Sequence, residues 1–291
     1  MPLRKSNLNA LIIKSLEEDK AFSDVTSRIL IPLDLMVNAR ILAKQDCVVC
    51  GLGIAKLVFK AIDQSLKFTP LVSDGKFIKN GAILAKIYGR ARNILAAERV
   101  ALNFLSRLSG IATLTRKFVD SVSGTGVKIL DTRKTTPLLR EPEKYAVRCG
   151  GGSNHRFDLA NFILIKDNHK QALAARPKRK LSNLSAFIYQ AKAKARSGIK
   201  IEIEVENLAE FKQAIAAKPD IIMLDNMTLK ALKRCALLRD KISPRTSLEA
   251  SGGINLKNIK KVSKSGVNSI SIGSLTHSPL AVDLSLEVFS K

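Results

Sequence analysis

The chain has 291 residues, of which 46% are hydrophobic and 25% are charged. This composition is typical of a globular protein with a real core, and the length suits two domains or one barrel with an appendage. Lysines and arginines number 49 against 25 acidic residues, giving a formal net charge of +24. The electrostatic field of such a positive charge favours nucleic acid, an anionic membrane surface or anionic small molecules as partners.

Three simple features argue against whole classes of protein. There is no Trp, and no basic run has interleaved aromatic residues, which disfavours a protein that binds single-stranded nucleic acid. No window approaches ~18 uninterrupted apolar residues, so no membrane span is predicted. The N-terminal run lacks a signal-peptide cleavage pattern, and a cytoplasmic location is therefore expected.

The cysteines predict little chemistry by themselves. Cys47 and Cys50 form a C-x-x-C, but the residues between them are valines in a run that resembles a strand. No second pair or nearby His completes a zinc site in the sequence. We interpret all four cysteines as packed thiols, with a metal half-site or a redox pair as the alternative.

The first third of the chain has the pattern of a mixed α and β domain. Its expected elements are a helix over 7–18, a polar loop at 22–27, strand residues at 35–50, a helix over 52–63, turns at 73–75 and 79–81, and a strand over 82–88. A long helix with one apolar face follows over 91–108. Gly110 is expected to break or bend it before a second helix that continues to Val122.

From residue 127 onward, short apolar runs alternate with helical segments. The runs are 127–130, 162–165, 199–205, 221–224, 247–250 and 270–272. This alternation predicts parallel β/α units, and six strands favour a closed or nearly closed barrel. A doubly wound sheet is the alternative.

The residues that follow these strands are chemically selective. Cations come first, then carboxylates, then glycine turns; they are Arg133, Lys134, His155, Arg156, Lys166, Glu204, Asp225, Ser251, Gly252 and Gly273, with His277 nearby. Arginine pairs with carboxylate or phosphate through two bonds, and neighbouring carboxylates can hold Mg²⁺. Each feature alone could be a solvated surface or, for Gly150–Gly152, a hinge. Together they predict a site for a phosphorylated, metal-associated anion.

Eight motifs in series resemble a known family. They are RNILAAERVALNFLSRLSGIAT at 92–113, LDTRKTTP at 130–137, EKYAVRCGGGSNHR at 143–156, LIKDNH at 164–169, IEIEVEN at 201–207, MLDNM at 223–227, EASGGI at 249–254 and SIGSLTHS at 271–278. In this order they resemble quinolinate phosphoribosyltransferase, also called carboxylating nicotinate-nucleotide pyrophosphorylase. The resemblance covers nearly the whole chain from residue 24.

The resemblance implies an α/β fold with an N-terminal α/β sandwich domain and a C-terminal open, TIM-like β/α barrel. The sandwich would span 1–112 and include the segment 279–291, and the barrel would span 113–278. It also implies a homodimer, or a hexamer built from dimers. One subunit's N-terminal domain would cover its partner's barrel mouth.

The implied reaction joins quinolinate to phosphoribosyl pyrophosphate with Mg²⁺ as cofactor. It releases pyrophosphate and CO₂ and yields nicotinate mononucleotide for NAD biosynthesis. This makes the chain a glycosyltransferase of the pentosyl type.

The resemblance also implies residue roles. Arg133, His155, Arg156 and Lys166 match the pocket for the quinolinate carboxylates, and Arg99 matches an arginine supplied by the partner subunit. Lys134 matches a lysine between the two substrate sites, with Thr135 also among the substrate-binding residues. Glu204 and Asp225 match the acidic pair near the ribose and Mg²⁺; the residues toward the 5′-phosphate are Ser251, Gly252, Gly273 and His277. Lys134, Glu204 and Asp225 are the expected catalytic residues.

Some features depart from the family pattern or favour rivals. Phe157, Asp158 and Asn161 replace smaller or apolar residues, and Pro142 interrupts the approach to a helix, which puts loop geometry in doubt. Molybdenum-transport-associated homologues share the fold and are the rival with another substrate. A nucleic-acid-binding protein is the rival from another class, resting on the net charge and the basic segment 176–196.

Overall fold

The structure is a computed structural model that describes residues 5–174 and 183–289. The chain divides into two compact units. The first comprises Met1–Arg116, Lys134–Gly152 and Ser274–Lys291, and the second comprises Lys117–Arg133 and Ser153–Gly273. The predicted combination of an N-terminal sheet domain with a parallel β/α domain is confirmed.

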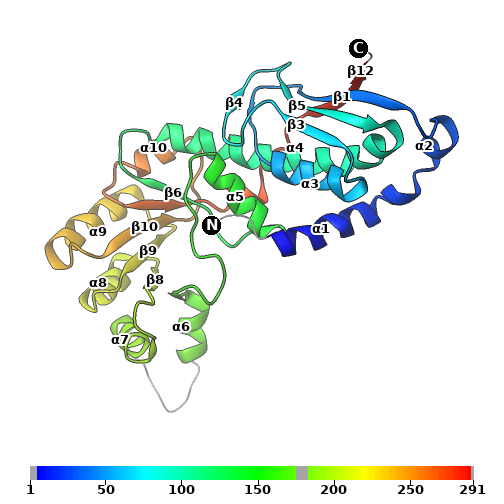
Figure 1. Cartoon of the computed structure of the whole chain (residues 1–291). Helices are drawn as coiled ribbons and strands as arrows, with labels where there is room; N and C mark the ends of the chain where they lie inside the picture. Colours follow the sequence, from blue (N-terminus) through cyan, green and yellow to red (C-terminus); the bar gives the residue numbers. More distant parts are fainter. Residues whose placement is uncertain (1–4, 175–182, 290–291) are drawn as a thin grey trace. The chain divides into compact units, whose positions relative to one another are not determined.

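The first unit is built on an antiparallel sheet with the order β12-β1-β5-β3 (Figure 1). Its strands are β1 (Met36–Ala43), β3 (Lys67–Pro70), β5 (Ile83–Arg90) and β12 (Leu284–Phe289), and a smaller pair joins β2 (Cys47–Val48) to β4 (Phe77–Ile78). Because β12 pairs with β1, the C-terminal segment is an edge strand of this sheet. Along β5 buried and exposed residues alternate, so one face of the sheet packs on the core.

Helices cover that face of the sheet (Figure 1). The helices of this unit are α1 (Lys5–Glu18), α2 (Val25–Leu30), α3 (Leu52–Ile62), α5 (Arg140–Cys149), α11 (Ser274–His277) and the first part of α4 (Ala91–Ser121), with a 3₁₀ turn η1 (Ala21–Ser23). In α3, the fully buried Ile54, Val58 and Phe59 recur at helical spacing. This spacing places one apolar stripe against the core.

The prediction that Gly110 breaks the long helix is wrong, because α4 is one continuous helix from Ala91 to Ser121. A Cβ atom at Gly110 would collide with the backbone carbonyl of Leu280. The glycine is therefore present to let the C-terminal segment approach the helix closely. Packing of this kind outweighs the cost of glycine in a helix, which is about 1 kcal/mol.

We expect Gly110→Ala to destabilise the protein by about 1–3 kcal/mol, the usual cost of overpacking a filled site. Gly53 is the matched control, because it also lies in a helix and a Cβ there would meet no atom within 4 Å. Gly53→Ala should instead be neutral or stabilise by up to ~1 kcal/mol. Urea unfolding of both variants tests this, and equal effects would contradict the packing argument.

Two smaller expectations also differ from the structure. Residues 22–27 were expected as a loop, yet α2 begins at Val25, and the Asp24 carboxylate accepts a hydrogen bond from the Ser27 N–H at 3.1 Å. An aspartate N-cap of this kind stabilises the start of a short helix. Pro142 does not interrupt α5, because it lies in the first turn, where a missing N–H costs little.

The second unit is a six-stranded parallel sheet. Its strands are β6 (Lys128–Leu130), β7 (Ile163–Ile165), β8 (Ile201–Val205), β9 (Ile221–Asp225), β10 (Ser247–Ser251) and β11 (Ser269–Ser271). The helices between them are α6 (Asp167–Ala174), α7 (Leu184–Lys194), α8 (Leu208–Ala216), α9 (Leu229–Ile242) and α10 (Ile259–Val262). All six predicted strands are therefore confirmed.

The strand order identifies this unit as an open barrel. Neighbours run consecutively from β7 to β11, and β11 then pairs with β6, the first strand. A doubly wound sheet would instead reverse its order at a switch point, so that alternative is wrong. On the free side of β6, the Ser153 N–H donates to the Ile129 carbonyl at 2.8 Å, and Asp131 N–H donates to the Ser153 carbonyl at 3.2 Å.

Within the described part of the chain, no helix is both long enough and apolar enough to cross a membrane.

Candidate active site

Two arginines lie close together after the first barrel strand. Arg133 follows β6, and Arg156 is buried, with its guanidinium donating to the Phe162 carbonyl at 3.2 Å. Burial lowers the pKa of Arg156, and the nearby positive charge of Arg133 lowers it further. The Arg133 Nε atom is buried and meets no hydrogen-bond acceptor among the described residues. Two adjacent guanidinium groups with an unused donor form a site suited to an anion.

A buried aspartate organises the loop that carries the next cation. Asp131, directly after β6, is fully buried and accepts a hydrogen bond from the His155 N–H at 2.9 Å and another from the Asn154 amide. The next turn closes on itself, because the Asn161 side chain accepts from the Phe157 N–H at 2.6 Å. The family departures at 157–161 therefore form a local turn of their own.

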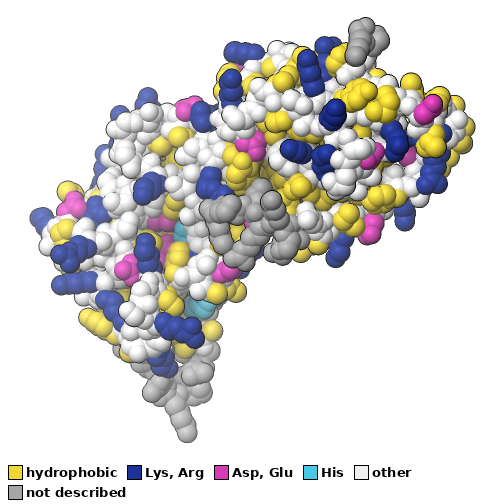
Figure 2. Space-filling model, in the orientation of Figure 1, with side chains coloured by type: hydrophobic (Ala, Val, Ile, Leu, Met, Phe, Trp, Pro, Cys, Tyr) yellow, Lys and Arg dark blue, Asp and Glu magenta, His cyan; other side chains and the backbone are white. Residues whose placement is uncertain are grey.

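The His155 ring points into the barrel and meets two carboxylates. Its Nε2 atom lies 3.1 Å from a Glu202 oxygen on β8 and 3.5 Å from a Glu249 oxygen on β10. All three side chains are buried. The sequence did not single out Glu249, although a glutamate in the middle of an apolar strand was a usable signal. Figure 2 shows histidine and acidic atoms in a hollow on the visible face.

Burial changes the acidity of these two carboxyl groups. It raises the pKa of Glu202 to about 8, against the opposing charges of Arg156 and Lys166. It raises the pKa of Glu249 to about 7, with Glu202 adding to the shift and His155 opposing it. Near neutral pH, Glu202 and Glu249 together therefore hold at least part of one proton. They lie near the cationic cluster, by which we mean Arg133, Arg156 and Lys166.

The pH dependence of folding should report this pair. The folded protein keeps the Glu202 proton up to about pH 8, whereas a carboxyl at its ordinary pKa of 4.5 has already lost it. The contribution of the Glu202 proton to the free energy of unfolding is therefore complete below about pH 4.5. It is lost as the pH rises through about 8.

We expect Glu202→Gln to flatten the fall in the free energy of unfolding between pH 5 and pH 8, since the amide has no proton to lose. Glu206→Gln serves as the control, because Glu206 is exposed just beyond the same strand. Urea unfolding across this range is the measurement. Parallel profiles for wild type and Glu202→Gln would contradict the assignment.

The next strands bring a lysine and two carboxylates to the same end of the barrel. The Lys166 Nζ atom lies 3.1 Å from a Glu204 oxygen, and Glu204 is buried. Asp225 ends the neighbouring strand β9 and accepts a hydrogen bond from the Asn226 amide at 2.8 Å. The predicted cation Lys166 and the predicted carboxylate Glu204 thus form an ion pair.

A glycine turn lies beside Asp225. The Asn226 N–H donates to the Ser251 carbonyl at 2.9 Å, which ties the ends of β9 and β10 together. Gly252 has a positive φ of 85°, and a Cβ there would overlap the Asn226 side chain. Only glycine fits this turn, which leaves its backbone open to a close approach by a ligand.

A cavity of about 870 Å³ in this unit lies mainly at the other end of the strands, where they begin. It is lined by residues at or before strand starts, such as Lys128, Lys200 and Ser247, and reaches His155 and Arg156 through the open side. In β/α barrels the catalytic residues lie instead at the carboxyl-terminal ends of the strands. We therefore interpret the cavity as the open interior of the barrel.

The remaining predicted site residues belong to the first unit, apart from Gly273, which follows β11. The Lys134 carbonyl accepts a hydrogen bond from the Thr276 hydroxyl at 2.6 Å, so this loop lies against α11, which carries His277. Thr135 accepts from the Arg140 Nε at 3.1 Å. Arg99 is exposed on α4.

Comparison with known proteins places these residues in a family. Residues 24–109 match the N-terminal domain of quinolinate phosphoribosyl transferase, and residues 111–287 match its C-terminal domain. A probable carboxylating nicotinate-nucleotide pyrophosphorylase from Bacillus subtilis is 40% identical over 93% of this chain and 90% of its own length. The chloroplastic carboxylating enzyme of that name from rice, Oryza sativa, is 39% identical over 97% of this chain and 78% of its own length. The chain belongs to the quinolinate phosphoribosyltransferase family.

A solved structure agrees with this membership. The nicotinate-nucleotide pyrophosphorylase from Francisella tularensis matches with a TM-score of 0.89 and 37% identity, covering 99% of this chain and 98% of that chain. The chain is therefore an enzyme of the phosphoribosyltransferase class, as its motifs predicted.

This phosphoribosyltransferase also has supporting residues that the sequence did not reveal. Glu143 is fully buried in α5, 2.9 Å from the Arg107 guanidinium, and it accepts the Thr136 N–H at 3.1 Å. Arg107 also donates to the Thr276 carbonyl. This network fixes the loop that carries Lys134 through hydrogen bonds to its neighbour Thr136. The sequence did not indicate that these residues contact one another, because Arg107 and Thr276 lie far from Glu143 in the chain.

Proposed function

We propose that this enzyme transfers the phosphoribosyl group of phosphoribosyl pyrophosphate to quinolinate. The products would be nicotinate mononucleotide, pyrophosphate and CO₂. The pairing of the Arg133 and Arg156 guanidinium groups, with Lys166 at the next strand end, supports this proposal most directly. Quinolinate carries two adjacent carboxylates and needs such a concentration of positive charge.

In the proposed reaction the ring nitrogen of quinolinate attacks the anomeric carbon of the ribose while pyrophosphate leaves. Positive charge develops on the ribose, and the carboxylates of Glu204 and Asp225 would stabilise it. Decarboxylation then needs no base, because the quaternised ring accepts the electrons left by CO₂. The cationic cluster orients the substrate for both steps.

The acidic pair also suits a magnesium ion in chemical type, since Mg²⁺ prefers carboxylate oxygens and keeps several waters. Glu204 already contacts Lys166 at 3.1 Å, so we propose that it reaches the ion through water while Asp225 is the more available ligand. Bound Mg²⁺ would neutralise the charge of the leaving pyrophosphate.

We further propose a dimer, alone or within a hexamer, in which Arg99 completes the partner's quinolinate pocket. The exposed position of Arg99 on α4 is compatible with this role. A cytoplasmic location also remains a prediction, because relatives in plants are named as chloroplastic or mitochondrial proteins.

No observation favours the nucleic-acid rival. The basic run 176–180 lies outside the described residues. Lys and Arg side chains are scattered over the visible face in Figure 2, without one dominant patch.

A product assay tests the proposal against the molybdenum-associated rival. Purified enzyme with quinolinate, phosphoribosyl pyrophosphate and Mg²⁺ should yield nicotinate mononucleotide, pyrophosphate and CO₂ in equal amounts. Omitting any one of the three should abolish product. Pyrophosphate without CO₂, or no product from an enzyme shown to be folded, would contradict the proposal.

A further inference from the structure

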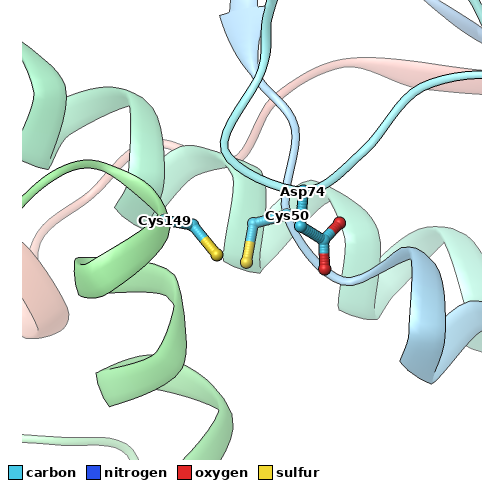
Figure 3. Close-up of side chains that lie close together, drawn as sticks. All are labelled: Cys50, Asp74 and Cys149. Atoms are coloured by element: carbon cyan, nitrogen blue, oxygen red, sulfur yellow. The ribbon is translucent and has the colours of Figure 1, made fainter.

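A second cluster of reactive side chains lies wholly in the first unit. Cys50 precedes α3, Asp74 lies in the turn before β4, and Cys149 ends α5. Figure 3 shows the two sulfur atoms pointing toward each other, with Asp74 beside Cys50. One reactive atom from each of the three residues lies within 4.8 Å of the others, and the Cys50 thiol hydrogen-bonds to the Cys149 sulfur.

The backbone on both sides of this pair is firmly held. Cys50 exchanges two hydrogen bonds with the Ser109 hydroxyl, at 3.0 and 3.3 Å. The Gly75 N–H donates to the Val49 carbonyl at 2.8 Å, and a Cβ at Gly75 would lie 3.2 Å from the Cys149 carbonyl oxygen. One turn thus packs against the backbone of both cysteines. The two sulfur atoms are thus held within 4.8 Å of each other on a fixed backbone.

The two thiols differ in reactivity and in access. The hydrogen bond from Cys50 lowers the pKa of Cys149 against the opposing effect of burial. Burial raises the pKa of Cys50. Cys149 is partly exposed, whereas Cys50 is fully buried. Cys149 therefore has the features of an attacking thiolate, and Cys50 those of a resolving thiol.

The neighbouring aspartate argues against a metal site as the use of this cluster. One Asp74 oxygen accepts the N–H groups of Gly51 and Leu52, at 3.0 and 3.1 Å, at the start of α3. The other accepts the Tyr145 hydroxyl at 2.9 Å. Its carboxylate is committed to structure, which leaves two sulfurs, fewer than the four ligands of a structural zinc site.

We propose that Cys50 and Cys149 form a reversible disulfide bond with each other. The oxidant is a low-molecular-weight disulfide such as oxidised glutathione. The Cys149 thiolate attacks one sulfur of the oxidant and releases one glutathione thiolate. The Cys50 thiol then loses its proton, attacks the Cys149 sulfur and releases the second. Two protein thiols are oxidised by two electrons, and the oxidant is reduced to two thiols.

This pairing differs from the one that the sequence suggests. In the C-x-x-C, Cys50 would pair with Cys47, but the partner of Cys50 in the cluster is Cys149. Cys47 lies buried in β2, and burial raises the pKa of its thiol to about 11. A thiol of that kind is a poor nucleophile near neutral pH.

The test is a redox titration of the full-length enzyme in mixtures of reduced and oxidised glutathione. Free thiols are then alkylated and the protein is mapped by mass spectrometry without reduction. We expect the oxidised protein to lose the mass of two hydrogen atoms and to yield a peptide pair linked through Cys50 and Cys149. Cys47→Ser and Cys235→Ser are the controls and should give the same linkage.

Two variants separate the steps. Cys50→Ala should stop at a glutathione adduct on Cys149. Cys149→Ala should form neither the glutathione adduct at this site nor the disulfide, because it removes the attacking thiolate. A Cys47–Cys50 linkage, no linkage in the most oxidising mixture, or protection of both thiols by equimolar Zn²⁺ would overturn the proposal.

Discussion

Arg133→Ala should lower kcat/KM for quinolinate by about thirtyfold or more, a loss of at least ~2 kcal/mol in transition-state binding. The Arg133 guanidinium lies beside that of Arg156, and its buried Nε has no hydrogen-bond acceptor among the described residues. A carboxylate placed there would gain charge-assisted bonds that water cannot replace. Steady-state rates at varied quinolinate measure the effect.

Two further variants make this result specific. Arg133→Lys keeps the charge but loses the planar fork, so it should recover only part of the activity. Arg245→Ala removes an exposed arginine from the turn before β10, at the strand-start end, and should leave kcat/KM unchanged. Wild-type kcat/KM in Arg133→Ala would exclude Arg133 from the pocket.

Arg99→Ala should also lose most activity, yet mixing it with Arg133→Ala should restore about a quarter of the wild-type rate if the sites are shared across a dimer. In a mixed dimer, one site receives an intact Arg99 from one chain and an intact Arg133 from the other. The second site carries both defects. Half of the dimers are mixed after random exchange, and half of their sites work.

The measurement is activity before and after subunit exchange, with exchange verified by native mass spectrometry of differently tagged chains. Mixing Arg99→Ala with itself under two tags is the control and should restore nothing. If Arg99 acted within its own chain, no mixed dimer would have an intact site. Verified exchange without recovery would therefore contradict the partner role of Arg99.

The fold followed from local signals in most of the chain. All six barrel strands were visible as short apolar runs, because both faces of a parallel strand are buried. Gly110 was misread, since its role depends on Leu280, far away in sequence. A glycine that ends a helix and one that admits a neighbouring backbone look alike in the sequence alone.

The part of the site made of charged residues at strand ends could be predicted from the sequence. Lys166 and Glu204 were both expected at strand ends, and the structure makes them an ion pair. Asp131 and Glu249 were missed as His155 partners because their role depends on which way a loop turns into the barrel. Buried carboxylates that hold a loop or share a proton have no local sequence signature beyond an acidic residue beside an apolar run.

Buried carboxyl groups support the cationic cluster formed by Arg133, Arg156 and Lys166. Like charges repel, and Arg133 lowers the pKa of Arg156 for that reason. Asp131 fixes the loop backbone, while Glu202 and Glu249 supply carboxyl groups beneath His155. The cluster is thus held by groups that the substrate need not displace, and such preorganisation favours rapid turnover.

The most direct test of the central claim compares quinolinate with nicotinate as the acceptor of the phosphoribosyl group. Nicotinate lacks the carboxylate that leaves as CO₂, and it would occupy only part of the paired guanidinium site. The account predicts efficient turnover of quinolinate, with CO₂ released in step with nicotinate mononucleotide, and little or no turnover of nicotinate at equal concentration. Equal or faster use of nicotinate would contradict it.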